Sequence, residues 1–263
     1  MIAQSGVAPK LASCSSAIPD IVVHDLTVAY GTHRPVLRHA DFAISAGETV
    51  ALIGANGAGK STLLKACLGL LQPQQGDVSI LGRSVTAASS SQRRRTLSAI
   101  GFVAQKHNLV LRLSVLTNVL HGCLGQRPGP LGWLHGTAPR ALRQRALAAL
   151  DRVGLADLAL RRADMLSGGQ QQRVAIARAL VDSPRLILAD EPAASLDPVA
   201  GEEIMQVFTR VSRETGTTLL FTTHHLGHAL RHSSRVLGLK DGILAIDAPS
   251  ETLHEGDLRG FYN

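Results

Sequence analysis

Residues 54–62 of the chain read GANGAGKST, and this stretch decides the fold. It follows directly on an apolar run, Thr49–Ile53, and precedes a segment of helical period that we expect to extend over residues 63–71. A strand, a glycine-rich turn that ends in Lys-Ser, and a helix are typical, in that order, of a P-loop. A chance glycine turn is the alternative, but the strand before it and the helix after it argue against that interpretation. The stretch therefore predicts an α/β core with a phosphate-binding turn at the end of a strand.

The residues of this turn suit the chemistry of a nucleoside triphosphate. Its glycines let successive backbone N–H groups point at phosphate oxygens, and the start of the following helix adds partial positive charge. Lys60 can reach the β- and γ-phosphates, and the Ser61 hydroxyl can ligate Mg²⁺. We therefore predict a site for ATP and Mg²⁺. The predicted phosphate-binding residues are Gly54, Asn56, Gly57, Gly59, Lys60, Ser61 and Thr62.

Two adjacent carboxylates follow a second apolar run. Asp190 and Glu191 come directly after Leu186–Ala189, at the end of an expected buried strand. Burying both charges is costly unless one of them faces a cation, so we assign Asp190 to Mg²⁺. Glu191 then points toward the γ-phosphate, where it can polarise the attacking water as a general base. Beside a P-loop, this pair predicts ATP hydrolysis.

A second anion-binding sequence lies at residues 166–170, which read LSGGQ and lead into a helical run over residues 170–181. A serine and two glycines at a helix start offer an anion a hydroxyl, close backbone approach and the helix dipole. The P-loop already supplies one γ-phosphate site. We therefore predict that Ser167, Gly169 and Gln170 bind ATP held by another subunit.

Beside the P-loop, this pentapeptide resembles the signature sequence of the ABC superfamily of ATPases. The resemblance covers nearly everything from residue 21 to the C-terminus. It implies an α/β fold with a P-loop NTPase (RecA-like) core, an antiparallel β subdomain and a helical ABC-specific insertion. The expected organisation is a disordered N-terminal extension at 1–19 and one nucleotide-binding domain at 20–263, with its catalytic core at 20–106 and 165–263 and its helical subdomain at 107–164.

Four further features match that superfamily residue by residue. Tyr30 resembles the aromatic residue that stacks on adenine. Gln105 resembles the glutamine that approaches Mg²⁺ and water and relays motion to a permease. Asp197 ends a Ser-Leu-Asp triplet that resembles a loop crossing the dimer interface, and His224 resembles the histidine that contacts the γ-phosphate and orients Glu191. The resemblance thus implies Glu191, His224 and Gln105 as catalytic residues, and Ser61, Gln105 and Asp190 at the metal.

Apolar runs of strand type alternate with segments of helical period, as an α/β fold requires. Residues 109–164 show little strand pattern. Within them, residues 139–154 space their apolar side chains, Leu147 included, like one face of a helix, and residues 125–139 are typical of a loop. A hairpin turn is expected at residues 240–242. The expected strands are residues 22–30, Thr49–Ile53, 100–104, Leu186–Ala189, 219–222, 236–239 and 243–247.

Composition argues against several functional classes. The 263 residues carry a net charge of +7, 3% aromatic residues and three cysteines. So few aromatic residues offer no base-stacking platform, and we do not expect nucleic acid as a partner. Scattered cysteines without metal spacing fit a reducing cytoplasm. No apolar run reaches the roughly 18 residues of a membrane helix, so we expect the chain not to span a membrane by itself.

Two clusters of basic residues have alternative interpretations. The histidines at positions 224, 225, 228 and 232 form two i,i+4 pairs, and such pairs can hold a metal. Because no carboxylate or cysteine joins them in the sequence, we interpret His225, His228 and His232 as solvated or helix-surface residues. The arginines at 93–95 are interpreted as a solvated face, with anionic lipid headgroups as the alternative contact.

Within the ABC superfamily, the chain resembles the ATPase subunit of phosphonate importers. This resemblance implies a homodimer of ATPase subunits, peripheral at the cytoplasmic face of the inner membrane, with integral membrane permease subunits and, indirectly, an extracytoplasmic solute-binding protein. The chain departs from these subunits at residues 222–225, which read TTHH where Leu-His-Gln is usual, and at Ala193, where a larger aliphatic residue is expected. Phosphite, phosphate or another small oxyanion therefore stays open as the cargo. The matching stretches are residues 109–125, 162–180, 188–198 and 249–263.

Other uses of the same ATPase remain open. The main alternative is a cytosolic ABC ATPase subunit of a phosphonate-metabolising enzyme complex, without transport. The match at residues 109–125, beside the expected permease contact, favours the importer. An exporter cassette is a further alternative, but the absence of a fused membrane domain in this sequence favours an importer. An ABC ATPase acting on nucleic acid or ribosomes usually has two cassettes or a large coiled-coil insertion, and this sequence has neither.

Overall fold

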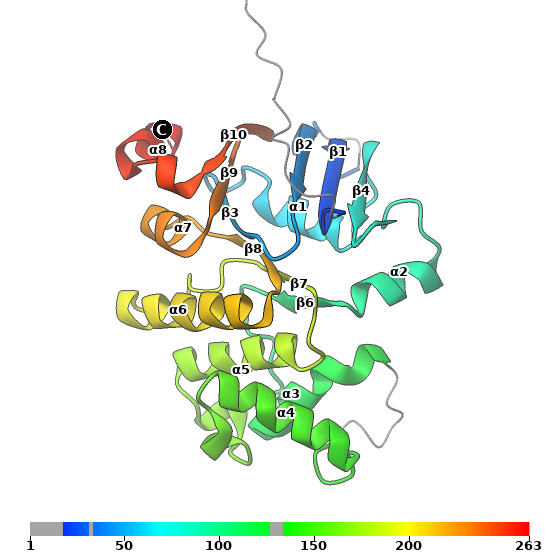
Figure 1. The fold of residues 1–263 in the computed structure, drawn as a ribbon, viewed down its shortest axis with the longest axis vertical. Coiled ribbons are helices and arrows are strands. Elements are labelled where there is room, and N and C mark those ends of the chain that lie inside the picture. Colours follow the sequence, from blue (N-terminus) through cyan, green and yellow to red (C-terminus); the bar gives the residue numbers. More distant parts are fainter. Residues whose placement is uncertain (1–17, 32–33, 127–133, 263) are drawn as a thin grey trace, which may run out of the picture.

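The computed structural model describes residues 18–31, 34–126 and 134–262, which form two sheets flanked by helices (Figure 1). The larger sheet has the strand order β10-β9-β3-β8-β7-β6. Neighbouring strands in it are parallel, except that β10 pairs antiparallel with β9. Its strands are β3 (Thr49–Ile53), β6 (Ile100–Val103), β7 (Leu186–Ala189), β8 (Thr218–Thr222), β9 (Arg235–Lys240) and β10 (Ile243–Pro249).

The central strands of this sheet are buried along their whole length, and mostly apolar, because both of their faces are covered. Every residue of β3, β7 and β8 is buried. Continuous burial of this kind is characteristic of parallel strands with helices on both sides. The predictions for these strands are confirmed: β3 and β7 have the expected bounds, and β8 begins one residue early. The expected hairpin also forms, with β9 and β10 longer than predicted.

The smaller sheet is antiparallel, with the order β2-β1-β4-β5. The predicted strand at residues 22–30 ends early, at Val28, so Tyr30 lies beyond it. The other three strands were not expected from the sequence. In β2, polar residues break the alternation and His39 has a φ of 48°, while β4 has a glycine, Gly76, as its second residue. The strands are β1 (Ile21–Val28), β2 (Leu37–Ile44), β4 (Gln75–Ile80) and β5 (Arg83–Ser84).

Helices cover the larger sheet and form a separate layer at one end of the molecule (Figure 1). The helix expected at residues 63–71 is α1 (Lys60–Cys67); it stops early because Gly69 takes a left-handed conformation, with a φ of 61°. The helix expected at 170–181 is α5 (Gly168–Leu180). The remaining α-helices around the sheets are α2 (Ser90–Leu97), α6 (Pro198–Thr215), α7 (Leu226–His232) and α8 (Glu255–Tyr262).

The predicted helical insertion is present. Its described residues form α3 (Val115–Leu120), α4 (Arg140–Arg152) and the 3₁₀ turns η1 (His121–Gln126), η3 (Ala156–Leu158) and η4 (Ala163–Met165). The apolar face expected for α4 was partly wrong, because the helix buries Ala146, Ala149 and Leu150 and leaves Leu147 exposed. The small alanines allow α4 to approach α3 and α5 closely. Of the loop predicted at 125–139, residues 127–133 lie outside the described part of the chain.

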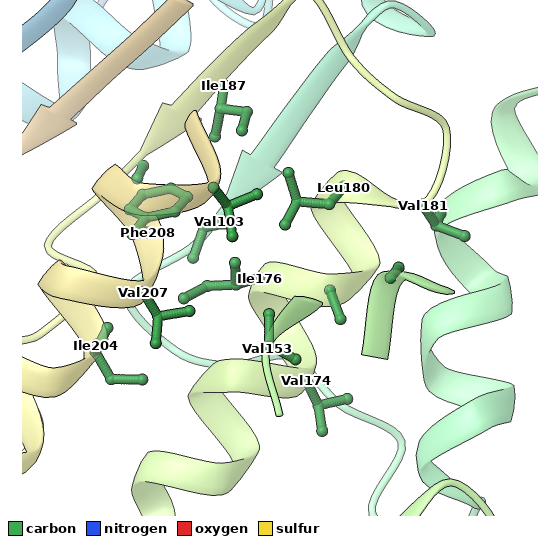
Figure 2. Close-up of a cluster of buried hydrophobic side chains, with 14 of the residues drawn as sticks. Val103, Val153, Val174, Ile176, Leu180, Val181, Ile187, Ile204, Val207 and Phe208 are labelled. Carbon is green, nitrogen blue, oxygen red and sulfur yellow. The ribbon is translucent and has the colours of Figure 1, made fainter. Parts of the chain in front are cut away.

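One hydrophobic core joins the insertion to the larger sheet. In Figure 2, Ile176 and Leu180 of α5 point toward Val103 of β6, Ile187 of β7 and Phe208 of α6. All five side chains are nearly or fully buried. Because protein interiors are packed as densely as organic crystals, a shift of α5 must be transmitted to its neighbours. Among the described residues, no helix is long and apolar enough to cross a membrane. The N-terminal extension expected at 1–19 lies almost entirely outside them.

Candidate nucleotide-binding site

Most of the residues predicted from the sequence gather at one edge of the larger sheet. Strands β3, β8, β7 and β6 lie side by side in this order, and all three pairs of neighbours run parallel. The carboxyl ends of such strands meet at the same edge, where ligands bind in open α/β sheets. The P-loop follows β3, Gln105 follows β6, Asp190 follows β7 and His224 follows β8. The fold therefore brings together side chains that are more than 160 residues apart in the sequence.

Two glycines of the P-loop are required by packing as well as by the turn. Gly54 has a φ of 153°, and a Cβ atom there would lie 2.5 Å from the carbonyl oxygen of Leu239. Gly59 has a φ of 107°, and its Cβ would lie 2.7 Å from Leu37. Larger residues at either position would push the loop away from β9 and β2, since L side chains rarely adopt such φ angles.

The ammonium group of Lys60 lies over the inside of the P-loop. Only 6% of the residue is exposed, and its Nζ donates to the carbonyl oxygens of Gly54 (2.8 Å) and Ala55 (3.2 Å). Asn56 and Gly57, between these groups, are exposed. The loop thus combines accessible backbone with a buried positive charge, an arrangement that suits the phosphates of a nucleotide.

The donors around Asp190 suit a hard divalent cation. Ser61 Oγ donates to Asp190 Oδ1 at 3.2 Å, so a hydroxyl and a carboxylate from two elements meet. Thr222, at the end of β8, donates to the same Asp190 oxygen at 2.8 Å. Mg²⁺ prefers such oxygen ligands and usually keeps several waters, so the residues present fit the metal. Thr222 was not predicted from the sequence, in which it looks like one more residue of a buried strand.

Three polar side chains converge on the carboxylate of Glu191, whose side chain is only 13% exposed. Gln105 Nε2 donates to Oε2 at 3.3 Å, His224 Nδ1 lies 3.6 Å from Oε2, and Lys60 Nζ lies 3.8 Å from Oε1. The backbone of Glu191 has a φ of 48°, and its N–H donates to Thr222 Oγ1 at 2.8 Å. A left-handed conformation is unfavourable for a non-glycine residue and concentrates at functional sites. The residues predicted as catalytic therefore form one connected group.

Tyr30 lies beside the P-loop although it is not part of a strand. Its hydroxyl is 3.2 Å from Oγ1 of Thr62, and 41% of the residue is exposed. An exposed ring next to the phosphate-binding turn is available to an aromatic base. The predicted adenine contact is thus close to the predicted phosphate contacts.

The LSGGQ pentapeptide begins α5 in the way the sequence indicated. Ser167 caps the helix: its Oγ accepts from the N–H of Gln170 at 3.3 Å, and the Gln170 side chain accepts from the N–H of Ser167 at 3.1 Å. These two residues, Gly169 and Asp197 line a cavity of about 590 Å³. Asp197 itself caps α6 through the N–H groups of residues 199 and 200. No described P-loop residue lines this cavity, so the pentapeptide faces a separate space from the P-loop of its own chain.

The interpretation of the histidines beyond His224 was partly wrong. His225 is exposed, as expected, but His228 and His232 are each only 7% exposed. A carboxylate also joins them, because Glu202 of α6 accepts a hydrogen bond from His232 Nε2 at 2.9 Å. The sequence could not show this contact, since Glu202 lies in another helix. Among the residues that the structure describes, no group of three histidine, cysteine or acidic side chains is arranged to hold a metal ion.

The profile of a protein family described as ABC transporter matches residues 37–194. The chain belongs to the ABC transporter family. It is 47% identical over 236 residues to the phosphonates import ATP-binding protein PhnC 2 of Pseudomonas savastanoi pv. phaseolicola, covering 88% of this chain and 85% of the relative. It is also 44% identical over 243 residues to the phosphate-import ATP-binding protein PhnC of Mycolicibacterium smegmatis, covering 92% and 91%.

Solved structures of ABC proteins have the same fold. The ATP-binding cassette MJ0796, in a dimeric post-hydrolysis state bound to ADP and Pi, is 33% identical, with a TM-score of 0.74 over 88% of this chain and 98% of its own. The protein cbiO1 of Clostridium perfringens, part of an ABC transporter complex, is 28% identical, with a TM-score of 0.80 over 92% and 94%. As an ABC ATPase this chain binds ATP, and the predicted P-loop NTPase fold with an antiparallel subdomain and a helical insertion is confirmed.

Proposed function

We propose that this chain is the ATP-hydrolysing subunit of an ABC importer whose cargo is a phosphonate or a related phosphorus oxyanion. The observation that carries the proposal is the convergence of three side chains, Lys60, Gln105 and His224, on the carboxylate of Glu191. Glu191 follows β7, which is separated from the P-loop strand β3 by β8 alone. The relatives' names support the cargo: both are import proteins for a phosphorus oxyanion.

Hydrolysis follows from this geometry. The P-loop N–H groups bind the phosphates, and Lys60 exchanges its two carbonyl acceptors for phosphate oxygens. Glu191 then accepts a proton from the water that attacks the γ-phosphate, as a general base. Gln105 and His224 hold that carboxylate in place, and His224 also reaches the γ-phosphate. Tyr30 stacks on the adenine ring.

Mg²⁺ fits between the P-loop and β7. Ser61 and Asp190 would hold it, with Gln105 nearby. When bound, the metal neutralises charge on the transferring phosphoryl group. Thr222 orients Asp190, since its hydroxyl donates to the same oxygen that accepts from Ser61.

The functional unit is a homodimer with two shared ATP sites. The cavity lined by Ser167, Gly169, Gln170 and Asp197 takes the γ-phosphate of ATP that is bound to the partner's P-loop. Two observations support this arrangement: the cavity lies apart from this chain's P-loop, and a structural neighbour is a dimer bound to ADP and Pi. Closure on ATP and opening after hydrolysis shift the population of the two states.

The permease contacts a second cavity, of about 630 Å³, between the insertion and the larger sheet. Its lining includes residues of α2, β6, η1 and the end of α5. Arg178 of α5 lines it and donates to the carbonyl oxygens of His107 (2.8 Å) and Asn108 (2.7 Å). A partner seated there therefore touches Arg178, which is hydrogen-bonded to the segment that follows Gln105. In this scheme residues 20–106 and 165–263 hydrolyse ATP, residues 107–164 transmit the motion, and the subunit sits peripherally on the cytoplasmic side of the membrane.

The proposal is tested by uptake and hydrolysis measured on the same variants. Glu191→Gln should keep ATP binding, lower kcat by about 10²–10⁴-fold, and abolish uptake of a labelled alkylphosphonate by cells with the native partners. Competition by phosphite and phosphate ranks the cargoes. Uptake that is unchanged in Glu191→Gln, although hydrolysis is lost, would refute the importer and favour the ATPase of a cytosolic enzyme complex. Hydrolysis at the wild-type rate would refute the role of Glu191.

A further inference from the structure

The segment that carries His224 is a short connection from β8 to α7, and it is one of the two places where the sequence departs from what the resemblance to phosphonate importer subunits implies. His224 is exposed and only 3.6 Å from Glu191 Oε2, so small movements of the connection change its distance to the catalytic centre. Within the connection, the N–H of His225 donates to Thr223 Oγ1 at 3.0 Å. The N–H of Thr223 donates to the carbonyl oxygen of Leu52 at 3.2 Å, and the carbonyl oxygen of His225 accepts from the N–H of Ala229 at 3.1 Å. Side-chain rings add to these backbone contacts.

Four histidine rings form a continuous series that starts at His224. The centroids of His224 and His225 are 5.4 Å apart, with the rings tilted by 42°. His225 stacks on His228 at 4.8 Å and 26°. His228 meets His232 edge to face, at 5.9 Å and 73°. We name the rings of residues 225, 228 and 232 the histidine series. Ring pairs at such separations attract each other beyond the area that they bury.

The histidine series ends on α6. His232 Nε2 bonds to Glu202 Oε1 at 2.9 Å, and His228 Nε2 lies 3.7 Å from the other oxygen of that carboxylate. The same helix starts at its cap, Asp197, which we place in the dimer interface. The carboxylate of Glu202 thus holds the ring of His232 against α6, with the ring of His228 beside it, and α6 is the helix that begins at the interface proposed for the partner's ATP.

Small residues make room for the buried ring of His228. A Cβ atom at Gly201 would lie 3.7 Å from His228 Cε1 and 3.6 Å from Cβ of Ala193. Ala193 stands where a larger aliphatic residue is expected, two residues after Glu191. Glu191, His224 and His228 also line one small pocket. The two departures of this chain, at Ala193 and beside His224, therefore meet in space.

We propose that the histidine series positions His224 for catalysis and couples it to α6, so that His225 and His228 are positioning residues for the proposed ATP hydrolysis. The inference rests on the proposed function, because it requires His224 to act at Glu191. A ring removed from the series leaves only the backbone bonds of the connection to hold the His224 side chain in place, and kcat falls while ATP binding is kept.

The charge state of His228 is compatible with this role. Burial, and after it the neighbouring His225, His232 and Arg231, lower the pKa of His228 to about 4, although Glu202 acts in the opposite direction. The ring is therefore neutral at the pH of an ATPase assay, and it stacks on His225 without adding a charge.

The experiment uses the full chain and compares kcat and KM for Mg-ATP with binding of a fluorescent ATP analogue. His225 is exposed, so His225→Ala should fold normally. We expect its kcat to fall roughly tenfold, because misplaced catalytic groups cost up to 10²-fold, with KM and nucleotide binding unchanged. His225→Phe keeps a ring in the stack and should recover most of the rate. His228→Ala should behave like His225→Ala, and His228→Phe like His225→Phe.

Two controls separate positioning from stability and from the proposed function. Val85→Ala removes buried apolar atoms far from α7, in the part of the chain after β5, and should keep the wild-type kcat. An unchanged kcat in His225→Ala, or equal losses in His225→Ala and His225→Phe, would overturn the histidine series. Loss of kcat in Val85→Ala equal to that of His228→Ala would overturn the part assigned to His228. Failure of the proposed function looks different: the wild type itself, with intact histidines, would hydrolyse no ATP.

Discussion

Removing one buried hydroxyl, in Thr222→Val, should weaken both the fold and the metal site. Thr222 is fully buried, and its Oγ1 makes two hydrogen bonds of 2.8 Å: it donates to Asp190 Oδ1 and accepts from the N–H of Glu191. Valine has nearly the same shape, so packing in β8 is kept while both bonds are lost. The N–H of Glu191 is then left without its partner in a backbone that already has a φ of 48°.

The size of the effect follows from these two bonds. A buried donor left unsatisfied costs about 1–3 kcal/mol, and a hydrogen bond to a charged group contributes about 1.5–3 kcal/mol. Asp190 is half-buried, so water can replace part of the hydrogen bond that its carboxylate loses. We therefore expect a loss of about 2–4 kcal/mol in the free energy of unfolding. Removing a group that orients a metal ligand typically lowers the metal affinity by about 10–100-fold. The Mg²⁺ concentration for half-maximal hydrolysis should therefore rise by about that factor.

Urea unfolding and an Mg²⁺ titration of ATPase activity measure the two effects. Thr222→Ser is the matched control, since it keeps the hydroxyl and loses only a methyl group, at a cost of about 1 kcal/mol. It should keep the Mg²⁺ dependence of the wild type. A Thr222→Val protein with wild-type Mg²⁺ dependence, or a serine variant that loses as much as the valine variant, would show that the hydroxyl does not orient Asp190.

Three further predictions concern other parts of the chain. Burial raises the thiol pKa of Cys67 and Cys123 to about 12, so at pH 8.5 neither should react with a thiol reagent in the folded protein, which peptide mapping against urea-unfolded protein checks. For the same reason the free energy of unfolding should fall as the pH rises above about 9, where the thiols of the unfolded chain ionise. Gly122→Ala places a Cβ against the carbonyl oxygen of Arg178 and should lower the urea midpoint by the equivalent of about 1–3 kcal/mol. Asp197→Ala removes the cap of α6 and should cost about 1 kcal/mol, measured in the same way, and also slow hydrolysis.

The sequence predicted the parallel sheet well because its strands are local patterns. Residues 50–53 and Leu186–Ala189 are uninterrupted apolar runs that end at turn or charged residues, and the structure buries every one of them. The antiparallel sheet has no such pattern. In β2 the burial follows contacts with β1 and β10 rather than strict alternation, and β1 pairs with register shifts. Such strands are specified by their partners, which a single segment does not reveal.

The same distinction holds at the candidate site. The P-loop and the pentapeptide are contiguous, so their chemistry can be inferred from residue order alone. The support of Glu191 is assembled from three strand ends, and Thr222 has no sequence signal that separates it from its neighbours in β8. His228 and His232 were interpreted as surface residues because their partner, Glu202, is contributed by a different helix. Contacts between elements, rather than residue types, decide both cases.

Helix α5 connects the two places where this ATPase meets other proteins. Its first turn, capped by Ser167, lines the cavity assigned to the partner's ATP, and near its last turn Arg178 holds the backbone of His107 and Asn108. The helix has 13 residues and is thus about 20 Å long. Its apolar face is packed into the core of Figure 2, and the Arg178 guanidinium is buried deeply enough to lower its pKa. Because Arg178 is buried and makes two hydrogen bonds, the contact between α5 and the segment after Gln105 has little freedom. A displacement of the first turn of α5 on ATP binding must therefore move that segment as well. In the proposed importer this helix connects the cavity assigned to the shared ATP with the cavity assigned to the permease.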